Sequence, residues 1–325
     1  MLGTARSRLC PTKLMERRLA LFEQLFSTIE REQKEPKHFY MDEQDGHLLS
    51  SNQSPPETYK CGAYTRMLIQ NNPFGFSDAA VGGHGSRSMM FHEMLALVRA
   101  LSPTVTKVDF SKAIVDENVL AKPTLSSRKK SLRHLVELYG TDPSKTLFRV
   151  LWQLGHADMD SLPLLCLVCT YARDPQLRQS FELVRTLRHG EVLDRVAMEQ
   201  SLEQGFPGRF SPAMKKSMAQ NVNTTWTYSG HLTGKARKIK QNVEPRPLSA
   251  AYAMLVGYLS GLRGERLLDS AYAALVASNR AQLLTALSLA SAQGILSLKN
   301  AAGIVEFDFS HLLTSEEQGF IHESY

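Results

Sequence analysis

From Ser88 onward, apolar residues recur three and four positions apart along most of the chain, which is the spacing of one face of an α-helix. Several of these segments begin with an N-cap residue followed by proline, as at Asp142-Pro143, Asp174-Pro175 and Ser211-Pro212. The pattern predicts helices over residues 88–101, 109–118, 124–139, 143–155, 158–171, 174–188, 194–204, 211–227, 248–261, 264–277 and 280–293.

The first part of the chain has a different pattern. Residues 12–34 place leucines and an isoleucine at helical spacing beside charged residues, which predicts one amphipathic helix. Residues 35–87 are rich in Ser, Asn, Gln, Pro and Gly, and this composition predicts a long loop or linker.

Near the C-terminus the period changes from helical to two. Two β-like runs, 295–299 and 304–309, flank a short turn, and in the second run apolar residues alternate strictly with acids. A helix that ends at Gly294 and leads into a hairpin is the element order of a winged-helix domain. We therefore expect a mainly α protein: a helical bundle with helix-turn-helix elements and a C-terminal β-hairpin resembling a wing.

Composition shifts divide the chain into three expected parts. These are 1–87 (an N-terminal helix plus a flexible linker), 88–230 (a helical DNA-binding domain) and 231–325 (a helical C-terminal domain with the hairpin). The stretch 230–247 between the last two is basic, contains Gly and Pro, and lacks apolar periodicity, which predicts a flexible cationic loop.

Composition also limits where the protein works. Its 325 residues are 43% hydrophobic, which is enough for a core, but no apolar run approaches the ~18 residues that span a bilayer. The N-terminal segment has no apolar stretch followed by a small-residue cleavage site, so we expect no signal peptide. Four cysteines in so long a chain form no disulfide framework. We therefore expect a cytoplasmic protein with no membrane partner.

Charge clustering is the most informative functional feature. The net charge is only +6, yet two windows contain no acid: one lies between Glu117 and Glu137, the other between Glu203 and Glu244. Clustered cations build a positive surface, whose usual partner is a phosphate backbone, because binding releases condensed counterions. The alternative is a solvated face on an ordinary basic protein.

Polar side chains accompany these cations. Short hydroxyls at the start of helix 124–139 can bond phosphate oxygens, amides in the second window can reach base edges, and a lysine stands at the hairpin tip. The expected DNA-binding residues are Lys122, Ser126, Ser127, Arg128, Lys129, Lys130, Arg133, Arg209, Lys215, Lys216, Asn221, Asn223, Lys235, Arg237, Lys238, Lys240 and Lys299. Trp226 and Tyr228 stand among them as stacking or core residues, and for Trp226 we expect the core.

Candidate chemistry is sparse. Cys166 and Cys169 form a lone CxxC in an apolar helix, which favours a core role over a zinc or redox site. Residues 82–86 are glycine-rich but lack the lysine and the preceding strand of a phosphate loop, which favours a flexible linker. Asp158 and Asp160 are typical of a helix N-terminus. We expect no catalytic residues, metal or cofactor, although distant residues can assemble a site.

One segment resembles a known family. Residues 115–139 resemble the helix-turn-helix segment of the small DNA-binding BrxA family of BREX phage-defence systems; the matching residues are Glu117, Asn118, Leu120, Thr124, Ser126, Ser127, Arg128 and Lys129. Residues 164–184 and the C-terminal helix and hairpin are similar to later elements of that family. The N-terminal ~85 residues and the greater length between 205 and 280 depart from it. The resemblance implies an all-helical, non-catalytic DNA-binding protein that acts beside other defence components.

Three hypotheses follow. The first is a non-catalytic DNA-binding accessory protein of a bacterial phage-defence system, which holds double-stranded DNA through its basic helices and loop. The second is a DNA-processing enzyme subunit, such as a helical glycosylase or a nuclease component, which a buried carboxylate facing the basic groove would favour. The third is a scaffold that binds another protein, for example a defence component, through helix 12–34.

Overall fold

The computed structural model describes residues 73–77, 79, 82–301 and 304–323, all of which belong to one contact unit, Leu68–Tyr325. The expected helix 12–34 and most of the expected linker 35–87 lie outside the described residues.

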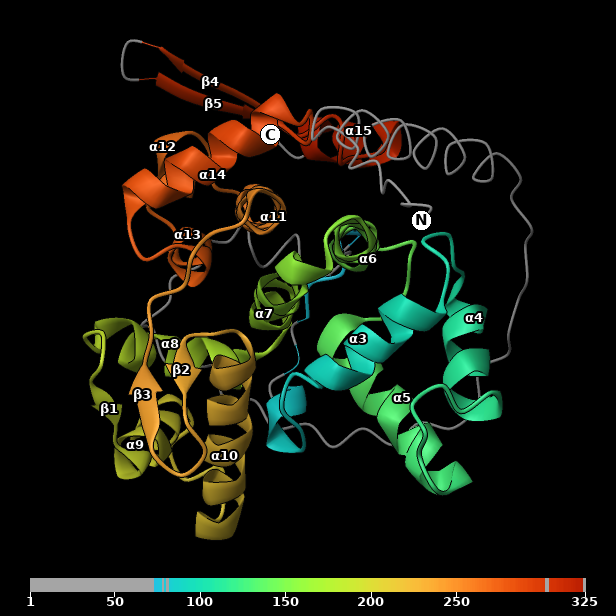
Figure 1. The fold of residues 1–325 in the computed structure, drawn as a ribbon, viewed down its shortest axis with the longest axis vertical. Helices are drawn as coiled ribbons and strands as arrows, with labels where there is room; N and C mark the ends of the chain where they lie inside the picture. The colour runs from blue at the N-terminus through green and yellow to red at the C-terminus, as the bar shows by residue number, and fades with distance from the viewer. Residues whose placement is uncertain (1–72, 78, 80–81, 302–303, 324–325) are drawn as a thin grey trace, which may run out of the picture. The chain divides into compact units, whose positions relative to one another are not determined.

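Helices make up most of the described chain (Figure 1), so the mainly α class is confirmed. They are η1 (Gly83–Gly85), α3 (Phe91–Ala100), α4 (Lys107–Ser111), η2 (Lys112–Asp116), α5 (Leu125–Tyr139), α6 (Thr146–Ala157), η3 (Met159–Ser161), α7 (Leu162–Arg173), α8 (Pro175–Thr186), α9 (Arg195–Gly205), α10 (Pro212–Tyr228), α11 (Pro247–Leu259), α12 (Glu265–Leu268), α13 (Ala271–Val276), α14 (Arg280–Ala292) and α15 (Ser315–Glu323).

Two predicted starts are confirmed, at Asp174-Pro175 and Ser211-Pro212, but Asp142-Pro143 starts no helix, because α6 begins at Thr146. Asp174 caps α8 by accepting from the backbone N–H groups of Gln176 and Leu177, and Ser211 caps α10. Asp158 caps η3, as its position predicted. The expected helix 264–277 is instead two short helices, because Ser270 caps a new helix, α13. Helix α15 was not predicted.

The core is centred on α7, which packs against α5, α6, α8, α11 and α13. Almost every residue of this helix is buried, including Cys166 and Cys169, so the core interpretation of the two cysteines is confirmed. Burial raises the pKa of the Cys169 thiol to about 11 and that of Cys166 still further. Trp226 of α10 is also fully buried, as expected.

The C-terminal hairpin has the predicted alternation of apolar and acidic residues, but its first strand begins two residues later than expected, at Ser297. Strand β4 (Ser297–Ala301) pairs antiparallel with β5 (Ile304–Asp308), and the apolar residues at 305, 307 and 309 are buried while the acids between them are exposed. Phe309 contacts Tyr258 of α11, with ring centroids 5.1 Å apart. The hairpin therefore closes one end of the helical core.

A second, unpredicted sheet lies beside α10 (Figure 1). It has the order β1–β3–β2, formed by β1 (Val192–Leu193), β2 (Leu232–Thr233) and β3 (Lys238–Lys240), and all its pairs are antiparallel. The expectation of a flexible cationic loop over 230–247 is therefore wrong. Strands of two or three residues are too short to show an alternating pattern.

Helices from both sides of the expected boundary at 230/231 share this core, because α11 packs on α6 and α7. The expected domains 88–230 and 231–325 would each fold alone. A shared core does not test this, so the division stays a prediction.

His231 beside this sheet predicts sensitivity to acid. Burial, together with the nearby Lys240 ammonium, lowers the pKa of His231 from 6.5 to about 3. Between those pH values the unfolded chain binds a proton that the folded chain excludes. Stability therefore falls with falling pH, by about 1.4 kcal/mol per unit. Between pH 7 and pH 5 the wild type should lose about 2 kcal/mol more of its free energy of unfolding than His231→Gln does, as measured by urea unfolding. If the wild type and His231→Gln lose the same free energy of unfolding between the two pH values, His231 is not the group responsible.

Candidate nucleic-acid interface

The glycine-rich segment before α3 is packed rather than flexible. Gly83 and His84 are buried in η1, so the expectation of a flexible linker over 82–86 is wrong. A Cβ at Gly82 would lie 2.1 Å from the Asp174 carboxylate, and one at Gly83 would lie 2.7 Å from Leu138. Glycine is needed here for close backbone approach.

His84 fastens this segment to two helices. Its Nδ1 lies 2.8 Å from Oδ2 of Asp174 on the N-terminal side of α8, and its Nε2 lies 2.7 Å from Oγ1 of Thr225 in α10. The Thr225 hydroxyl also accepts from the backbone N–H of Met89 at 2.8 Å. Asp174, His84 and Thr225 are all buried. The segment from Gly82 to Met90 is therefore held at both ends.

Asp174 is ionised within this buried group. Burial by itself raises the pKa of the carboxyl, but the His84 ring and backbone N–H, together with the N–H of Leu177, bring the pKa below its usual value of 3.8. A carboxylate that accepts several hydrogen bonds in the interior fixes the position of every donor around it.

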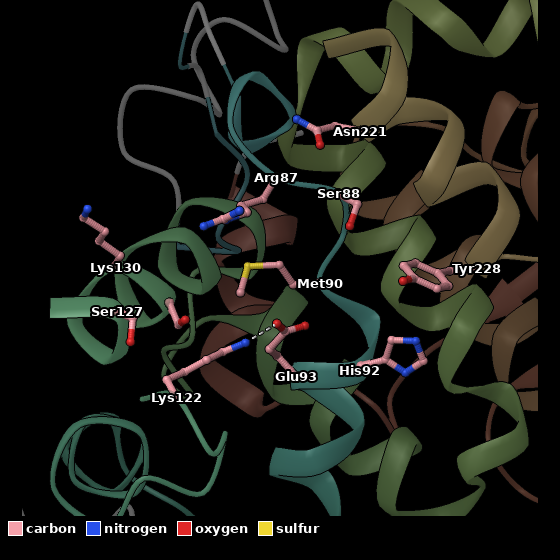
Figure 2. Close-up of a pocket in the computed structure, with 11 residues that line it drawn as sticks. Arg87, Ser88, Met90, His92, Glu93, Lys122, Ser127, Lys130, Asn221 and Tyr228 are labelled. Atoms are coloured by element: carbon pink, nitrogen blue, oxygen red, sulfur yellow. Dashed lines mark hydrogen bonds and ion pairs between the residues drawn. The ribbon is translucent and has the colours of Figure 1, made fainter. Parts of the chain in front are cut away.

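The end of the segment that His84 fastens, at Arg87, Ser88 and Met90, lines a cavity of about 390 Å³ (Figure 2). The cavity is lined by Arg87, Ser88, Met90, His92, Glu93, Lys122, Ser127, Lys130, Ser131, Asn221 and Tyr228. Figure 2 shows the α5 residues on one side and the α10 residues on the other, with the segment that leads into α3 between them. The two acid-free windows of the sequence therefore meet across this cavity.

The lining is rich in unpaired positive charge. Its lining includes three cations and one carboxylate, and the Lys122 ammonium pairs with Glu93 at 2.9 Å. Arg87 and Lys130 are exposed and form no ion pair with any described residue. The cavity therefore favours an anion.

Four expected DNA-binding residues line this cavity: Lys122, Ser127, Lys130 and Asn221. The Asn221 amide donates to the His84 carbonyl at 3.1 Å, which ties α10 to the segment before α3. Ser126 and Lys129 are exposed on the same first turns of α5, and Lys129 pairs with no described acid.

The other expected residues lie elsewhere on the described chain. Four of them are exposed: Arg209, Lys216, Lys235 and Arg237. Three others form ion pairs: Arg133 with Glu137, Lys215 with Glu203 and Lys299 with Glu306. Arg128 donates to the Val115 carbonyl, and the Lys238 ammonium donates to Thr227 Oγ1 and the Gly234 carbonyl.

Asn223 and Lys240 are buried, so their side chains cannot reach a nucleic acid on the surface. Burial lowers the pKa of the Lys240 ammonium. Both residues are therefore left out of the interface, and the sequence-based expectation for them is corrected.

Sequence reasoning missed Arg87, Ser131 and Tyr228. Arg87 follows the glycine-rich segment that was interpreted as linker, and Ser131 is a single hydroxyl on the inner side of α5. Tyr228 was recognised only as one of two aromatics; its ring packs edge-on against His92, with centroids 4.9 Å apart. These residues come together only in the tertiary structure, where η1 packs on both α5 and α10 and the α3 rings contact Tyr228.

Comparisons with known proteins give no family for the chain: no family model matches it, and no curated protein is significantly similar. Within the described ranges, no group of three or more His, Cys, Asp or Glu side chains is placed to hold a metal ion. None of the helices in the described part of the chain is both long and apolar enough to cross a membrane.

Proposed function

We propose that the protein binds double-stranded DNA through the surface around the cavity, which α5, Arg87 and the exposed face of α10 form. One observation carries the proposal: cations from two separate parts of the sequence meet there, and several have no acid partner among the described residues. Such cations are free to neutralise phosphates.

Helix α5 is the proposed docking element. Thr124 and Ser127 form a reciprocal capping box at its start, and exposed Leu125 and Ser126 follow the cap directly. The helix packs on η2, which precedes it in the chain, in the order of a helix-turn-helix. Backbone N–H groups at the start of α5, with Lys129 and Lys130 one turn on, suit a phosphate.

The hairpin is proposed as a weak wing. Lys299 is exposed near its tip, but its ammonium lies 3.7 Å from the Glu306 carboxylate on the neighbouring strand, so its charge is partly offset. The accessory role in a BREX-like phage-defence system rests on the resemblance of residues 115–139 alone. The scaffold role of helix 12–34 concerns residues outside the described part and stays a hypothesis.

A DNA-processing enzyme is the second candidate, because a carboxylate lines the basic cavity, although this carboxylate is only partly buried. Glu93 lines the cavity, and its carboxylate is held 2.9 Å from the Lys122 ammonium. The carboxylate is held by a lysine of the chain itself, and this contact favours a binding role over catalysis.

Charge reversal on α5 tests the proposal. We expect Lys129→Glu/Lys130→Glu to weaken binding to every duplex alike, because phosphate contacts carry no sequence information. The expected loss is about tenfold for each contact, or about 100-fold for the pair, by fluorescence anisotropy.

The matched control is Arg266→Glu/Arg280→Glu, which changes the net charge equally on α12 and α14. The ion pairs of Arg280 with Glu265 and Asp269 are exposed and contribute little stability. Equal losses for the two double variants would mean that α5 is not the docking surface.

A further inference from the structure

Several polar groups around the cavity have no partner within the described chain. The Ser131 side chain is only 8% exposed, lines the cavity, and makes no hydrogen bond with a described residue. Arg87 and Lys130 likewise make neither hydrogen bonds nor ion pairs there through their side chains. These donors line the cavity, and they are available to a ligand that supplies acceptor oxygens.

An aromatic surface lies on the other side of the same cavity. The Tyr228 ring is held edge-on by His92, and Phe91 packs at 6.0 Å between centroids. Tyr228 is half-buried, so part of its ring remains accessible, and its hydroxyl bonds no described residue. Aromatic side chains of this kind stack on nucleic-acid bases with little preference for sequence.

The size of the cavity limits the ligand. About 390 Å³ is at the lower end of the range for small-molecule sites. It suits one nucleotide unit, whereas a base-paired duplex is too wide to enter. Figure 2 shows the cationic side, with Lys122 and Lys130, across from the aromatic side, with Tyr228 and His92.

We propose that this cavity binds a single nucleoside 5′-phosphate unit, with the phosphate at Arg87, Lys130 and Ser131 and the base against Tyr228. This inference rests on the proposed function, because the nucleotide in the cavity would be one that is unstacked from the bound DNA. A free nucleotide has the same chemistry. Unstacking costs least where the base is already unpaired. The protein should therefore prefer DNA that contains an unpaired base.

The test compares two duplexes of equal length, one fully paired and one with a single unpaired adenine, using the full-length chain. We expect the wild type to bind the second about tenfold more tightly. Tyr228→Ala should abolish that preference, so that both duplexes bind with equal affinity, whereas Tyr228→Phe should retain the preference. Ser131→Ala, which only removes a hydroxyl, should reduce the preference even if Tyr228→Ala fails to fold.

Titration with deoxyadenosine monophosphate and with inorganic phosphate separates the two sources of the ligand. We expect the nucleotide to bind at least tenfold more tightly than phosphate. Nucleotide binding without duplex binding would support the cavity as a free-nucleotide site and contradict the proposed function. Duplex binding with neither a preference for the unpaired adenine nor nucleotide binding would overturn the cavity proposal alone. Equal affinities for phosphate and nucleotide would overturn the stacking role of Tyr228.

Discussion

Asp174→Ala is expected to lower the free energy of unfolding by about 3–5 kcal/mol. The carboxylate accepts from the His84 ring and backbone N–H and caps α8 through the N–H groups of Gln176 and Leu177. Alanine supplies no acceptor, so these buried donors lose their partner together, which costs far more than one exposed hydrogen bond.

Asp194→Ala is the matched control. Asp194 also caps a helix, α9, by accepting from the N–H of Val196, but it is exposed and bonds no distant segment of the described chain. Its loss should cost about 1 kcal/mol. Urea unfolding monitored by circular dichroism measures both. A loss for Asp174→Ala no greater than that for Asp194→Ala would show that the His84 contact contributes nothing to stability.

The contact between Asp174 and His84 also links the core to the proposed function. His84 stands three residues before Arg87, and Asn221 of α10 holds the His84 carbonyl. Loss of this contact would free the segment that carries Arg87 and Ser88 into the cavity. The stability of the core and the shape of the cavity are therefore expected to change together in Asp174→Ala.

The helices and the hairpin follow from local sequence because their signals are local. A period of 3.6 with an N-cap and a first-turn proline fixes α8 and α10, and a period of two fixes β5. The strands β1 to β3 escaped prediction because two or three residues carry no measurable period.

The site was only partly predictable, for a different reason. The acid-free windows include Lys122, Lys130 and Asn221, which line the candidate site, but nothing local indicates that α5 and α10 lie on opposite sides of one cavity. His84 and Thr225 are 141 positions apart in the chain. The glycines before His84 were misread because a flexible turn and a close-packed backbone both favour glycine.

The affinity for duplex DNA is expected to fall about 10³-fold between 50 and 200 mM salt. Cations without acid partners among the described residues include Arg87, Lys129 and Lys130 beside the cavity and Lys216 on α10. If about six phosphates are neutralised in all, the slope of log affinity against log salt is roughly −5. Weak attraction through net charge alone releases few counterions and gives a much shallower slope.

A salt titration of duplex binding by fluorescence anisotropy is therefore the most direct test of the account. A slope near −5 for the wild type is predicted, and Lys129→Glu/Lys130→Glu should make it shallower by about two units, because two phosphate contacts are lost. The control Arg266→Glu/Arg280→Glu should retain the wild-type slope. A wild-type slope near zero would contradict the claim that this surface binds a phosphate backbone.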